Sequence, residues 1–146
     1  MKITYKGDYA LKTILDLAGH FGDAPVTIND LSSRLDIPTK FLEQILLDLK
    51  RAGFVESRRG KIGGYSLAKE PAKITLGEVV RFIDGPLEPI ACVGKKYSGC
   101  HDLESCVFRG IWSQVGSSTA KILDNITFED LLKRLKKNNK TFIYQI

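Results

Sequence analysis

The sequence contains no long hydrophobic run. No uninterrupted apolar stretch approaches the roughly 18–20 residues that a membrane-spanning helix needs, which argues against such a helix. The first residues, MKITYKGDYALK, are polar and lack the apolar segment and small-residue cleavage site of a signal peptide. We therefore expect a cytoplasmic protein, in a compartment where thiols stay reduced.

Cysteine is scarce and unevenly distributed. The chain has 3 cysteines among 146 residues, and all of them lie between Cys92 and Cys106. An odd number of thiols in a reducing compartment argues against a disulfide framework. Internal repeats and low-complexity linkers are also missing. The length therefore corresponds to one ordinary domain, or to one compact domain with an added dimerisation element.

The composition is that of a globular protein. Hydrophobic residues make up 43% and charged residues 27% of the chain, which is enough to bury a core and excludes a disordered protein. The formal net charge is +5. This charge permits an anionic partner such as nucleic acid but does not identify one.

Hydrophobic spacing predicts three helices near the N-terminus. The first runs from about Thr4 to His20. Thr27 is expected to cap a short second helix that ends at Asp36-Ile37-Pro38, because the residue before a proline avoids the helical conformation. A third helix is expected from Thr39 to Ala52, with Gly53 as its left-handed stop. Two helices joined by a tight turn match either a DNA-binding helix–turn–helix or an ordinary helical hairpin.

A basic hairpin follows the third predicted helix. Residues Phe54–Ser57 and Tyr65–Ala68 are expected to form two strands, with a glycine-rich tip between them. Between Lys50 and Lys61 there are five basic residues and one acidic residue. Such a run is usually only a solvated surface, but here it lies beside the candidate recognition helix, where it can contact phosphates or enter a minor groove. The arrangement favours a winged helix–turn–helix.

The second half of the chain is expected to hold an irregular loop and a long helix. Thr75 and Glu78 form the pattern of a capping box at the start of a short helix, which Gly85-Pro86 ends. No regular structure is expected from Leu87 to about Glu104, and a loop of this length in a compact domain is usually functional. A helix from about Ser105 to Asn125 carries an apolar face that one small winged domain cannot cover, so we assign that face to a partner subunit.

The loop carries all the thiols, with the spacing Cys92-x7-Cys100-x5-Cys106. Three thiols on one irregular loop can converge on a metal. Zinc sites usually have closer pairs of ligands, whereas wide spacing favours an iron–sulfur cluster, which is several ångströms across. His101 and Glu104 are nearby candidates for a fourth ligand.

These elements predict a mainly α fold with a small β-hairpin wing: a winged helix–turn–helix with a long C-terminal dimerisation helix. We expect the DNA-binding domain at residues 1–74. Residues 75–146 are expected to hold the cluster-binding loop (about 87–106), the dimerisation helix and a C-terminal helix that Thr127 caps. The tail from Lys133 to Lys140 is basic and is expected to be frayed.

Several segments together resemble the Rrf-type family of winged-helix transcription regulators, which includes IscR-, NsrR- and CymR-like members. The segments are Thr4-x-Lys6-Gly7-Asp8-Tyr9-Ala10, Phe41-Leu42-Glu43-Gln44, Arg59-Gly60, Gly63-Gly64-Tyr65 and Asp124-Asn125-Ile126-Thr127. Each is weak alone, but the combination is specific and covers nearly the whole chain. The resemblance implies a homodimer with a winged helix–turn–helix, a crossing dimer helix and, in cluster-bearing members, a three-cysteine loop.

The resemblance also implies roles on the DNA side. Thr39, Lys40, Glu43 and Gln44 fall where the family's recognition helix meets base edges, and Arg59 falls where its wing approaches the minor groove. Thr39 and Lys40 differ from the serine pattern of IscR-like members, so the operator preference is not carried over. The candidate DNA-binding residues are Thr27, Thr39, Lys40, Glu43, Gln44, Arg58, Arg59 and Lys61.

The cysteine loop departs from part of the family. IscR-like members place a histidine three residues after the third cysteine; here that position is Arg109, which excludes a histidine ligand there. NsrR-like members instead resemble this chain at Asp8. In the family, a carboxylate at this position can ligate the cluster from the partner subunit. This resemblance favours a four-iron over a two-iron cluster. An acid in the first turn of a helix is also fully explained by the helix dipole. The candidate metal ligands are Cys92, Cys100, Cys106 and Asp8, with His101, Glu104, water or an exogenous thiol as alternatives to Asp8.

The combined prediction is a DNA-binding repressor whose affinity for a near-palindromic operator is controlled by an iron–sulfur cluster that senses redox state, nitric oxide or iron–sulfur status. With Asp8 as a ligand, the loop would be tied to the first helix of the other subunit, and through it to Leu42 and Ile45 beneath the recognition helix. The alternatives are a cluster-free regulator that senses thiol oxidation or zinc, and a regulator of cysteine metabolism. An enzyme is disfavoured, since no cysteine has an evident histidine and carboxylate arrangement.

Overall fold

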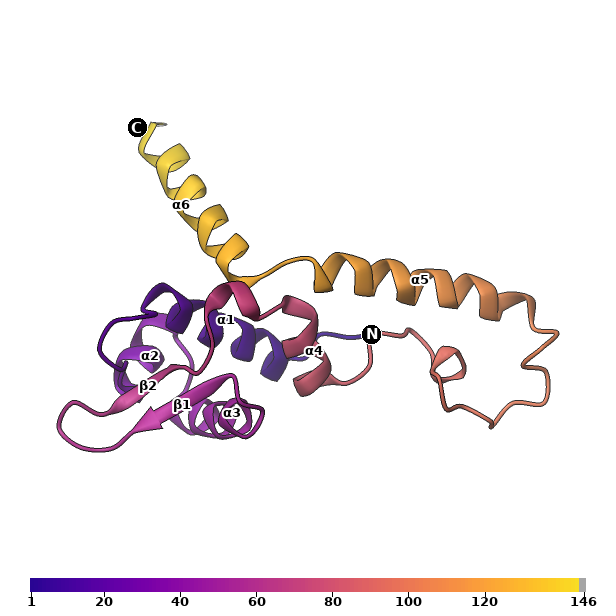
Figure 1. Ribbon diagram of the computed structural model, residues 1–146, viewed down its shortest axis with the longest axis horizontal. Coiled ribbons are helices and arrows are strands. Elements are labelled where there is room, and N and C mark those ends of the chain that lie inside the picture. Colours follow the sequence, from indigo (N-terminus) through magenta and orange to yellow (C-terminus); the bar gives the residue numbers. More distant parts are fainter. Residues whose placement is uncertain (145–146) are drawn as a thin grey trace.

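The computed structural model describes the backbone of residues 1–144 and the side chains of residues 1–139. It consists of helices, one two-stranded hairpin and two short 3-10 helices (Figure 1). In chain order the elements are α1 (Tyr5–Gly19), α2 (Ile28–Leu35), α3 (Thr39–Arg51), β1 (Val55–Arg58), β2 (Gly64–Leu67), η1 (Pro71–Lys73), α4 (Leu76–Asp84), η2 (Ala91–Val93), α5 (Val107–Asp124) and α6 (Phe128–Tyr144). The mainly helical fold with a small hairpin is therefore confirmed.

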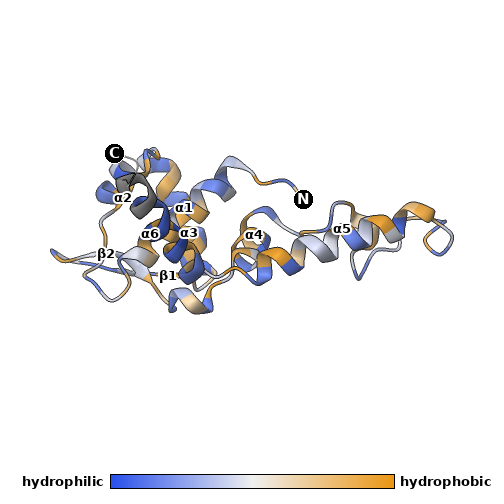
Figure 2. Cartoon of the chain, turned by 90° about the horizontal axis from the view of Figure 1, so that it is seen from above, coloured by the Kyte–Doolittle hydropathy of each residue, from blue (hydrophilic) through white to orange (hydrophobic). Residues whose placement is uncertain are grey.

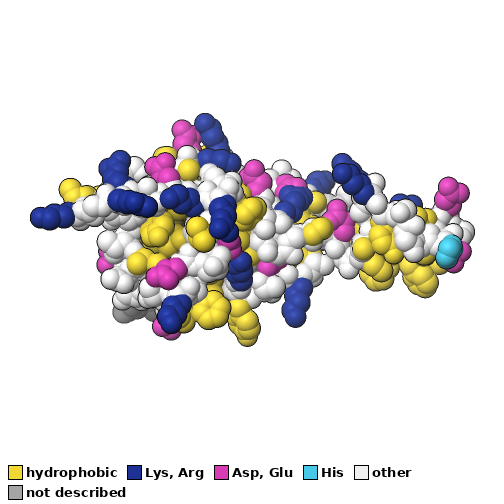
Figure 3. Space-filling model, turned by 90° about the horizontal axis from the view of Figure 1, so that it is seen from below, with side chains coloured by type: hydrophobic (Ala, Val, Ile, Leu, Met, Phe, Trp, Pro, Cys, Tyr) yellow, Lys and Arg dark blue, Asp and Glu magenta, His cyan; other side chains and the backbone are white. Residues whose placement is uncertain are grey.

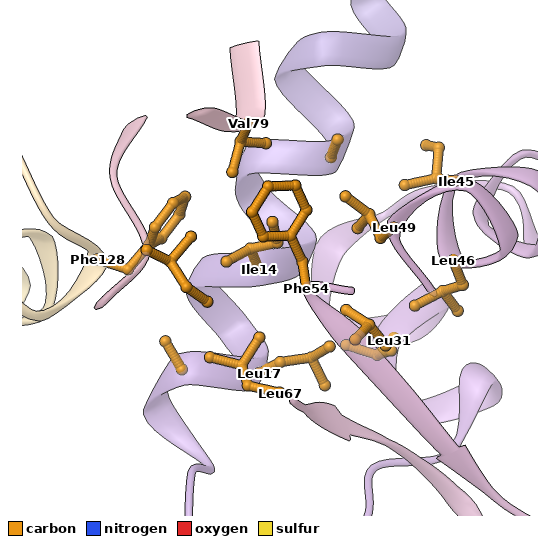
Figure 4. Close-up of a cluster of buried hydrophobic side chains, with 14 of the residues drawn as sticks. Ile14, Leu17, Leu31, Ile45, Leu46, Leu49, Phe54, Leu67, Val79 and Phe128 are labelled. Carbon is orange, nitrogen blue, oxygen red and sulfur yellow. The ribbon is translucent and has the colours of Figure 1, made fainter. Parts of the chain in front are cut away.

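Helix α1 lies at the centre of the body, and most other elements pack around it. Ile14 and Leu17 of α1 are fully buried among side chains from α2, α3, the hairpin and α4 (Figure 4). Phe128, at the start of α6, is 0% exposed in the same core, and its backbone N–H donates to the oxygen of Ile74 at 3.0 Å. Elements from both sides of residue 74 thus share one core; the functional division into 1–74 and 75–146 stays a prediction.

Threonine side chains begin the main helices of the body. The hydroxyls of Thr4, Thr27 and Thr75 each accept a backbone N–H from the first turn of the helix that follows, at 3.0–3.2 Å. At α4 the predicted capping box is complete, because the Glu78 carboxylate accepts the N–H of Thr75 at 2.9 Å. Side-chain caps satisfy donors that a helix leaves unpaired at its N-terminus, so these positions fix where the helices start.

The first turn of α1 is clamped by the end of α4. The Asp84 carboxylate accepts the backbone N–H of Thr4 at 3.0 Å and the hydroxyl of Thr4 at 2.5 Å. Gly7 is buried directly against this carboxylate, and a Cβ atom there would collide with it. The clamp joins the start of the chain to the residue immediately before the Gly85-Pro86 helix stop.

Helix α5 and the cysteine loop form an arm that projects from the body (Figure 1). Only Gly116 is buried among the residues of α5, and it packs against Glu88 and Pro89 of the loop. Apolar residues recur along the arm (Figure 2), and many of their side chains are exposed. None of the helices in the described part of the chain is both long and apolar enough to cross a membrane.

The C-terminal segment differs from the sequence prediction. Helix α6 continues to Tyr144, so the prediction of a frayed tail from Lys133 to Lys140 was wrong. The Thr127 hydroxyl accepts the N–H of Asp130 at 3.2 Å, and Lys133 lies 3.5 Å from Glu129 one turn earlier. The acids in the first turn also match the helix dipole, and with the pair of Glu129 and Lys133 these local interactions favour the helix.

The junction of α4 and α5 depends on one bidentate ion pair. Arg81 donates to both carboxylate oxygens of Asp124, at 2.6 and 2.8 Å. The hydrogen bonds from Arg81, and then its charge, hold the pKa of Asp124 below the ordinary value of 3.8. A carboxylate with a depressed pKa contributes stability that is fully present above its unfolded pKa and is lost as the pH falls through its folded pKa.

Asp124→Asn is therefore expected to reduce the free energy of unfolding at neutral pH. It should also make that free energy vary less with pH in the acid range. The loss should be below about 1 kcal/mol, because exposed pairs are screened by solvent and these side chains are 40% and 42% exposed. Urea titrations from about pH 7 to about pH 2 measure the difference between the two proteins, which should shrink as Asp124 protonates. A difference that stays constant across this range would contradict the assignment.

Candidate DNA interface and cysteine loop

The turn between α2 and α3 has the geometry of a helix–turn–helix. Asp36 ends α2 in the left-handed conformation at φ 52°, and Ile37, which follows it, is 1% exposed in the core. The Ser32 hydroxyl donates to the oxygen of Ile37 at 2.7 Å, which closes the turn. The two helices are therefore held at a defined angle, and the predicted break before Pro38 is confirmed.

Helix α3 buries one face and exposes the other. The buried residues are Leu42, Ile45, Leu46 and Leu49, as expected for a recognition helix seated on the core. Lys40, Glu43 and Gln44 are exposed. Thr39 is half-buried and its hydroxyl donates to that of Ser32 at 3.2 Å, so it also fixes the start of α3. Thr27 is exposed at the start of α2 and acts as a helix cap.

An ion pair beside the exposed face of α3 was not foreseen from the sequence. The Asp48 carboxylate accepts the Nζ of Lys6 at 2.6 Å and the Nε2 of Gln44 at 3.2 Å. The Gln44 contact has the ordinary spacing of four residues within a helix, which the sequence could have indicated. The Lys6 contact joins α1 to α3, and no pattern in a single sequence predicts it.

The wing is a short antiparallel hairpin with a basic tip. Val55 pairs with Leu67 and Arg58 with Gly64. A Cβ atom on Gly64, whose φ is +153°, would lie 2.5 Å from the oxygen of Val26, so the close approach of the hairpin to the segment before α2 requires glycine. Arg58, Arg59 and Lys61 are exposed, and Figure 3 shows basic side chains at the wing tip. Lys50 donates to Ser57 at 2.6 Å, which ties the end of α3 to β1.

Replacing Arg58, Arg59 and Lys61 together by alanine is expected to weaken DNA binding by a similar factor for all sequences. If each contacts one phosphate, the slope of log affinity against log salt should fall in magnitude by about 2.5 to 3, since each contact contributes about 0.9. Titrations at several salt concentrations measure this slope. Lys73→Ala in η1, which packs against α6 away from the wing, is the control. An unchanged slope in the triple variant would contradict a phosphate-binding wing.

The three cysteines lie at different places on the arm. Cys92 is half-buried in η2, Cys100 is exposed in the loop, and Cys106 is half-buried directly before α5. In the described part of the chain, no group of three or more cysteine, histidine or carboxylate side chains is close enough to hold a metal ion. The structure therefore does not bring the three thiols together, and their convergence on one metal stays a prediction. Metal binding to thiols is coupled to local folding, because the ligands of a site are rarely all in place before the ion binds.

Among the other candidate ligands, Asp8 lies on α1, whereas His101 and Glu104 lie on the cysteine loop, and Glu104 lines the same pocket as Cys106. Asp8 lies in the first turn of α1 and pairs with Lys12 at 2.6 Å, and it lines an open pocket of about 660 Å³ with residues 2–5. His101 and Glu104 are exposed in the loop. The Asp8 side chain is thus partly exposed, and its role as a ligand from a second copy of the chain stays a prediction.

Arg109 holds the two ends of the cysteine loop. Its Nε donates to the backbone oxygen of Cys92 at 3.1 Å, and its Nη1 donates to the backbone oxygen of Leu103 at 3.4 Å. Arg109 and Cys106 line the same pocket of about 280 Å³. The sequence identified Arg109 only as a position where a histidine ligand is excluded; in the structure it organises the loop.

Comparisons with known proteins match nearly the whole chain. The family model Rrf2, described as "Iron-dependent Transcriptional regulator", matches residues 3–134. An rrf2-like HTH-type transcriptional regulator of Rhodobacter capsulatus is 42% identical over 137 residues, covering 89% of this chain and 91% of the relative. The HTH-type transcriptional regulator IscR of Yersinia enterocolitica is 36% identical over 132 residues, covering 90% of this chain and 79% of the relative.

Solved structures agree with this match. CymR, the global cysteine regulator of B. subtilis, has a TM-score of 0.76 at 30% identity, covering 92% of this chain and 98% of that one. IscR of T. potens has a TM-score of 0.74 at 33% identity, covering 94% of this chain and 90% of that one. With its winged helix–turn–helix, its family match and these relatives, the chain belongs to the Rrf2 family and is a DNA-binding transcriptional regulator rather than an enzyme.

Proposed function

We propose that this regulator is a homodimeric repressor whose affinity for its operator is controlled by an iron–sulfur cluster bound to Cys92, Cys100 and Cys106. The observation that carries the proposal is the position of all three thiols in the one loop between α4 and α5. The family description "Iron-dependent" supports an iron-containing ligand. The cluster-bearing relatives that the sequence resembles have a loop of the same kind.

The chemistry of the donor set fits such a cluster. Thiolates are the usual ligands of iron–sulfur clusters, and three of them leave one position for a different ligand. The fourth ligand is Asp8 from a second copy of the chain, with His101 as the alternative. When bound, an incompletely thiolate-ligated cluster supplies reactivity toward oxidants and small molecules. Cys100 is the exposed thiol of the three, whereas Cys92 and Cys106 are half-buried.

The arm supports a dimer. One broad face of α5, which the sequence assigned to a partner, carries large apolar side chains that are exposed. They are Phe108 (61% exposed), Ile111 (54%), Val115 (42%) and Ile122 (61%). Exposure of this many large apolar side chains on one face of a monomer usually marks a protein interface. A second copy of the chain can cover this face with its own α5, because a two-fold interface uses the same surface on both subunits. The dimer would present two α3 helices to a near-palindromic operator.

Contacts within the chain connect the loop to the recognition helix. Asp84 lies immediately before the loop and clamps Thr4 at the start of α1. The same turn of α1 carries Lys6, which pairs with Asp48 of α3. A change in the loop therefore reaches α3 through α1, and the operator affinity changes to the extent that the two loop states differ in these contacts.

A cluster-free regulator that responds to thiol oxidation, zinc or cysteine metabolism is the second candidate. The likeness to CymR, the global cysteine regulator of B. subtilis, over 92% of this chain favours it. Both candidates keep the DNA-binding function and the exposed Cys100. They differ in the cofactor.

Purification without oxygen separates the two candidates. A brown protein with matched amounts of iron and acid-labile sulfide is expected, and the shape of its visible absorption distinguishes a four-iron from a two-iron cluster. A colourless protein that also fails to take up iron and sulfide on reconstitution would overturn the cluster proposal and favour the thiol or zinc regulator.

A further inference from the structure

We propose that Asp48, held by Lys6, is a positioning residue that fixes the orientation of the Gln44 side-chain amide and so determines which base Gln44 recognises. This inference rests on the proposed function in one respect, because it requires α3 to read the operator. It does not depend on the cysteines. Neither Lys6 nor Asp48 was among the candidate DNA-binding residues.

The geometry places one carboxylate between two helices. Oδ1 of Asp48 accepts a hydrogen from the Nε2 of Gln44 at 3.2 Å, and Oδ2 accepts one from the Nζ of Lys6 at 2.6 Å. Arg51 approaches Oδ1 at 3.7 Å. The Asp48 side chain is only 16% exposed, whereas those of Lys6 and Arg51 are 45% and 67% exposed. The carboxylate is therefore the inner member of the group, and Gln44 reaches it from the exposed surface of α3.

The charge of Asp48 decides which end of the amide it can bind. The hydrogen bond from Lys6 contributes most to lowering the pKa of Asp48 below 3.8, so the carboxylate stays ionised at neutral pH. An ionised carboxylate only accepts hydrogen bonds, whereas a glutamine amide has a donating NH₂ and an accepting oxygen. Gln44 must therefore turn its NH₂ group toward Asp48. Its oxygen and its second N–H hydrogen remain for a base edge.

This orientation suits one base better than the others. An amide that offers one acceptor and one donor side by side pairs with N6 and N7 of adenine in the major groove. Without Asp48 the amide can rotate about its terminal bond and exchange the two groups. Lys6 contributes to fixing the amide of Gln44, because it holds the Asp48 carboxylate in place from α1, a helix outside the helix–turn–helix. The predicted preference at the base pair that Gln44 contacts is therefore A·T.

The test compares the base preferences of full-length variants on a library of operator sequences. Gln44→Ala first identifies the base pair that depends on Gln44. Asp48→Asn is expected to reduce discrimination at that same base pair by about tenfold, since a bidentate contact loses its fixed geometry. An asparagine can donate as well as accept, so it no longer restricts the amide. Lys6→Met is expected to reduce discrimination at the same base pair by a smaller factor.

Asp16→Asn is the matched control. Asp16 pairs with Arg34 at 3.0 and 2.7 Å, joins α1 to α2, and its side chain is 12% exposed, but it does not touch the exposed face of α3. This variant should melt at a temperature similar to Asp48→Asn and keep the wild-type base preferences. The double variant Gln44→Ala/Asp48→Asn should behave as Gln44→Ala alone, because Asp48 acts only through Gln44.

The outcomes distinguish this inference from the proposed function. If the wild-type protein discriminates between sequences but Asp48→Asn has the same preference at every base pair, the positioning role is wrong and DNA recognition by α3 stands. A shift at a base pair that Gln44→Ala leaves unaffected would also overturn it. If the wild-type protein binds all sequences equally, recognition by α3 and the inference both fail.

Discussion

Replacing Ile111 by glutamate is expected to convert the protein from a dimer to a monomer and to weaken operator binding by about 100- to 10,000-fold, the range by which linking two binding modules raises affinity. Ile111 lies in the middle of the exposed apolar face of α5 and is 54% exposed in the single chain. In a two-fold interface the substitution occurs twice, so two carboxylates would lose water where apolar side chains meet. The fold of each chain should survive, because α5 contributes only Gly116 to the buried residues.

Sedimentation equilibrium measures the mass of the variant, and a DNA-binding titration measures its affinity. Ser117→Glu adds the same charge to the same helix, at an exposed position that the helical period places away from the apolar face. This control should remain a dimer and bind as the wild type does. An Ile111→Glu variant that is still a dimer with unchanged affinity would show that the face serves another purpose.

Alanine at Cys92, Cys100 or Cys106 is expected to change operator affinity by about 5- to 150-fold and to remove its response to oxidants, a range typical of coupling between two sites. Each thiol is one of the three cysteines of the loop, so each substitution removes one of the proposed ligands. The loop would then stay in its unliganded arrangement. The measurement is a DNA titration with and without reconstitution by iron and sulfide, repeated after exposure to an oxidant.

Ser98→Ala provides the control for this series, because Ser98 is exposed in the same loop and is not among the candidate ligands. It should keep the wild-type affinity and response. Wild-type behaviour in all three cysteine variants would exclude a sensing role for the loop. If one cysteine variant alone is affected, the site needs fewer thiols than the proposal assigns.

The body of the fold was accessible from the sequence because local signals determine it. Thr27 and Thr75 mark the starts of helices, and Gly53 adopts a φ of +80° after α3 as expected of a helix stop. The bounds of both strands differ from the predicted ones by one residue. Each of these features involves residues close together in the chain. The extension of α6 to Tyr144 did not follow from the basic composition of the tail, although lysine and arginine have high helix propensities.

The site was predicted less completely. The exposed positions of Lys40, Glu43 and Gln44 and the basic wing agree with the sequence analysis, and all three cysteines lie on the loop where irregular structure was predicted. The contacts that hold the site and the loop in place could not be predicted from the sequence, because they join distant parts of the chain. Asp84 with Thr4 and Arg109 with Cys92 are separated by 80 and 17 residues, and no periodic pattern relates such partners.

The way in which Arg109 holds the cysteine loop constrains its two ends but not the sequence between them. The guanidinium binds the main-chain oxygens of Cys92 and Leu103, which every amino acid possesses, and it touches no side chain of the intervening segment in these hydrogen bonds. These two hydrogen bonds therefore place no demand on the side chains of residues 94–102. The proposed cluster requires the thiol of Cys100, but the residues around that cysteine can differ while Arg109 holds the ends of the loop in place. A single scaffold with its arm and wing unchanged could then accept segments that respond to different chemical signals, with Arg109 as the fixed point between them.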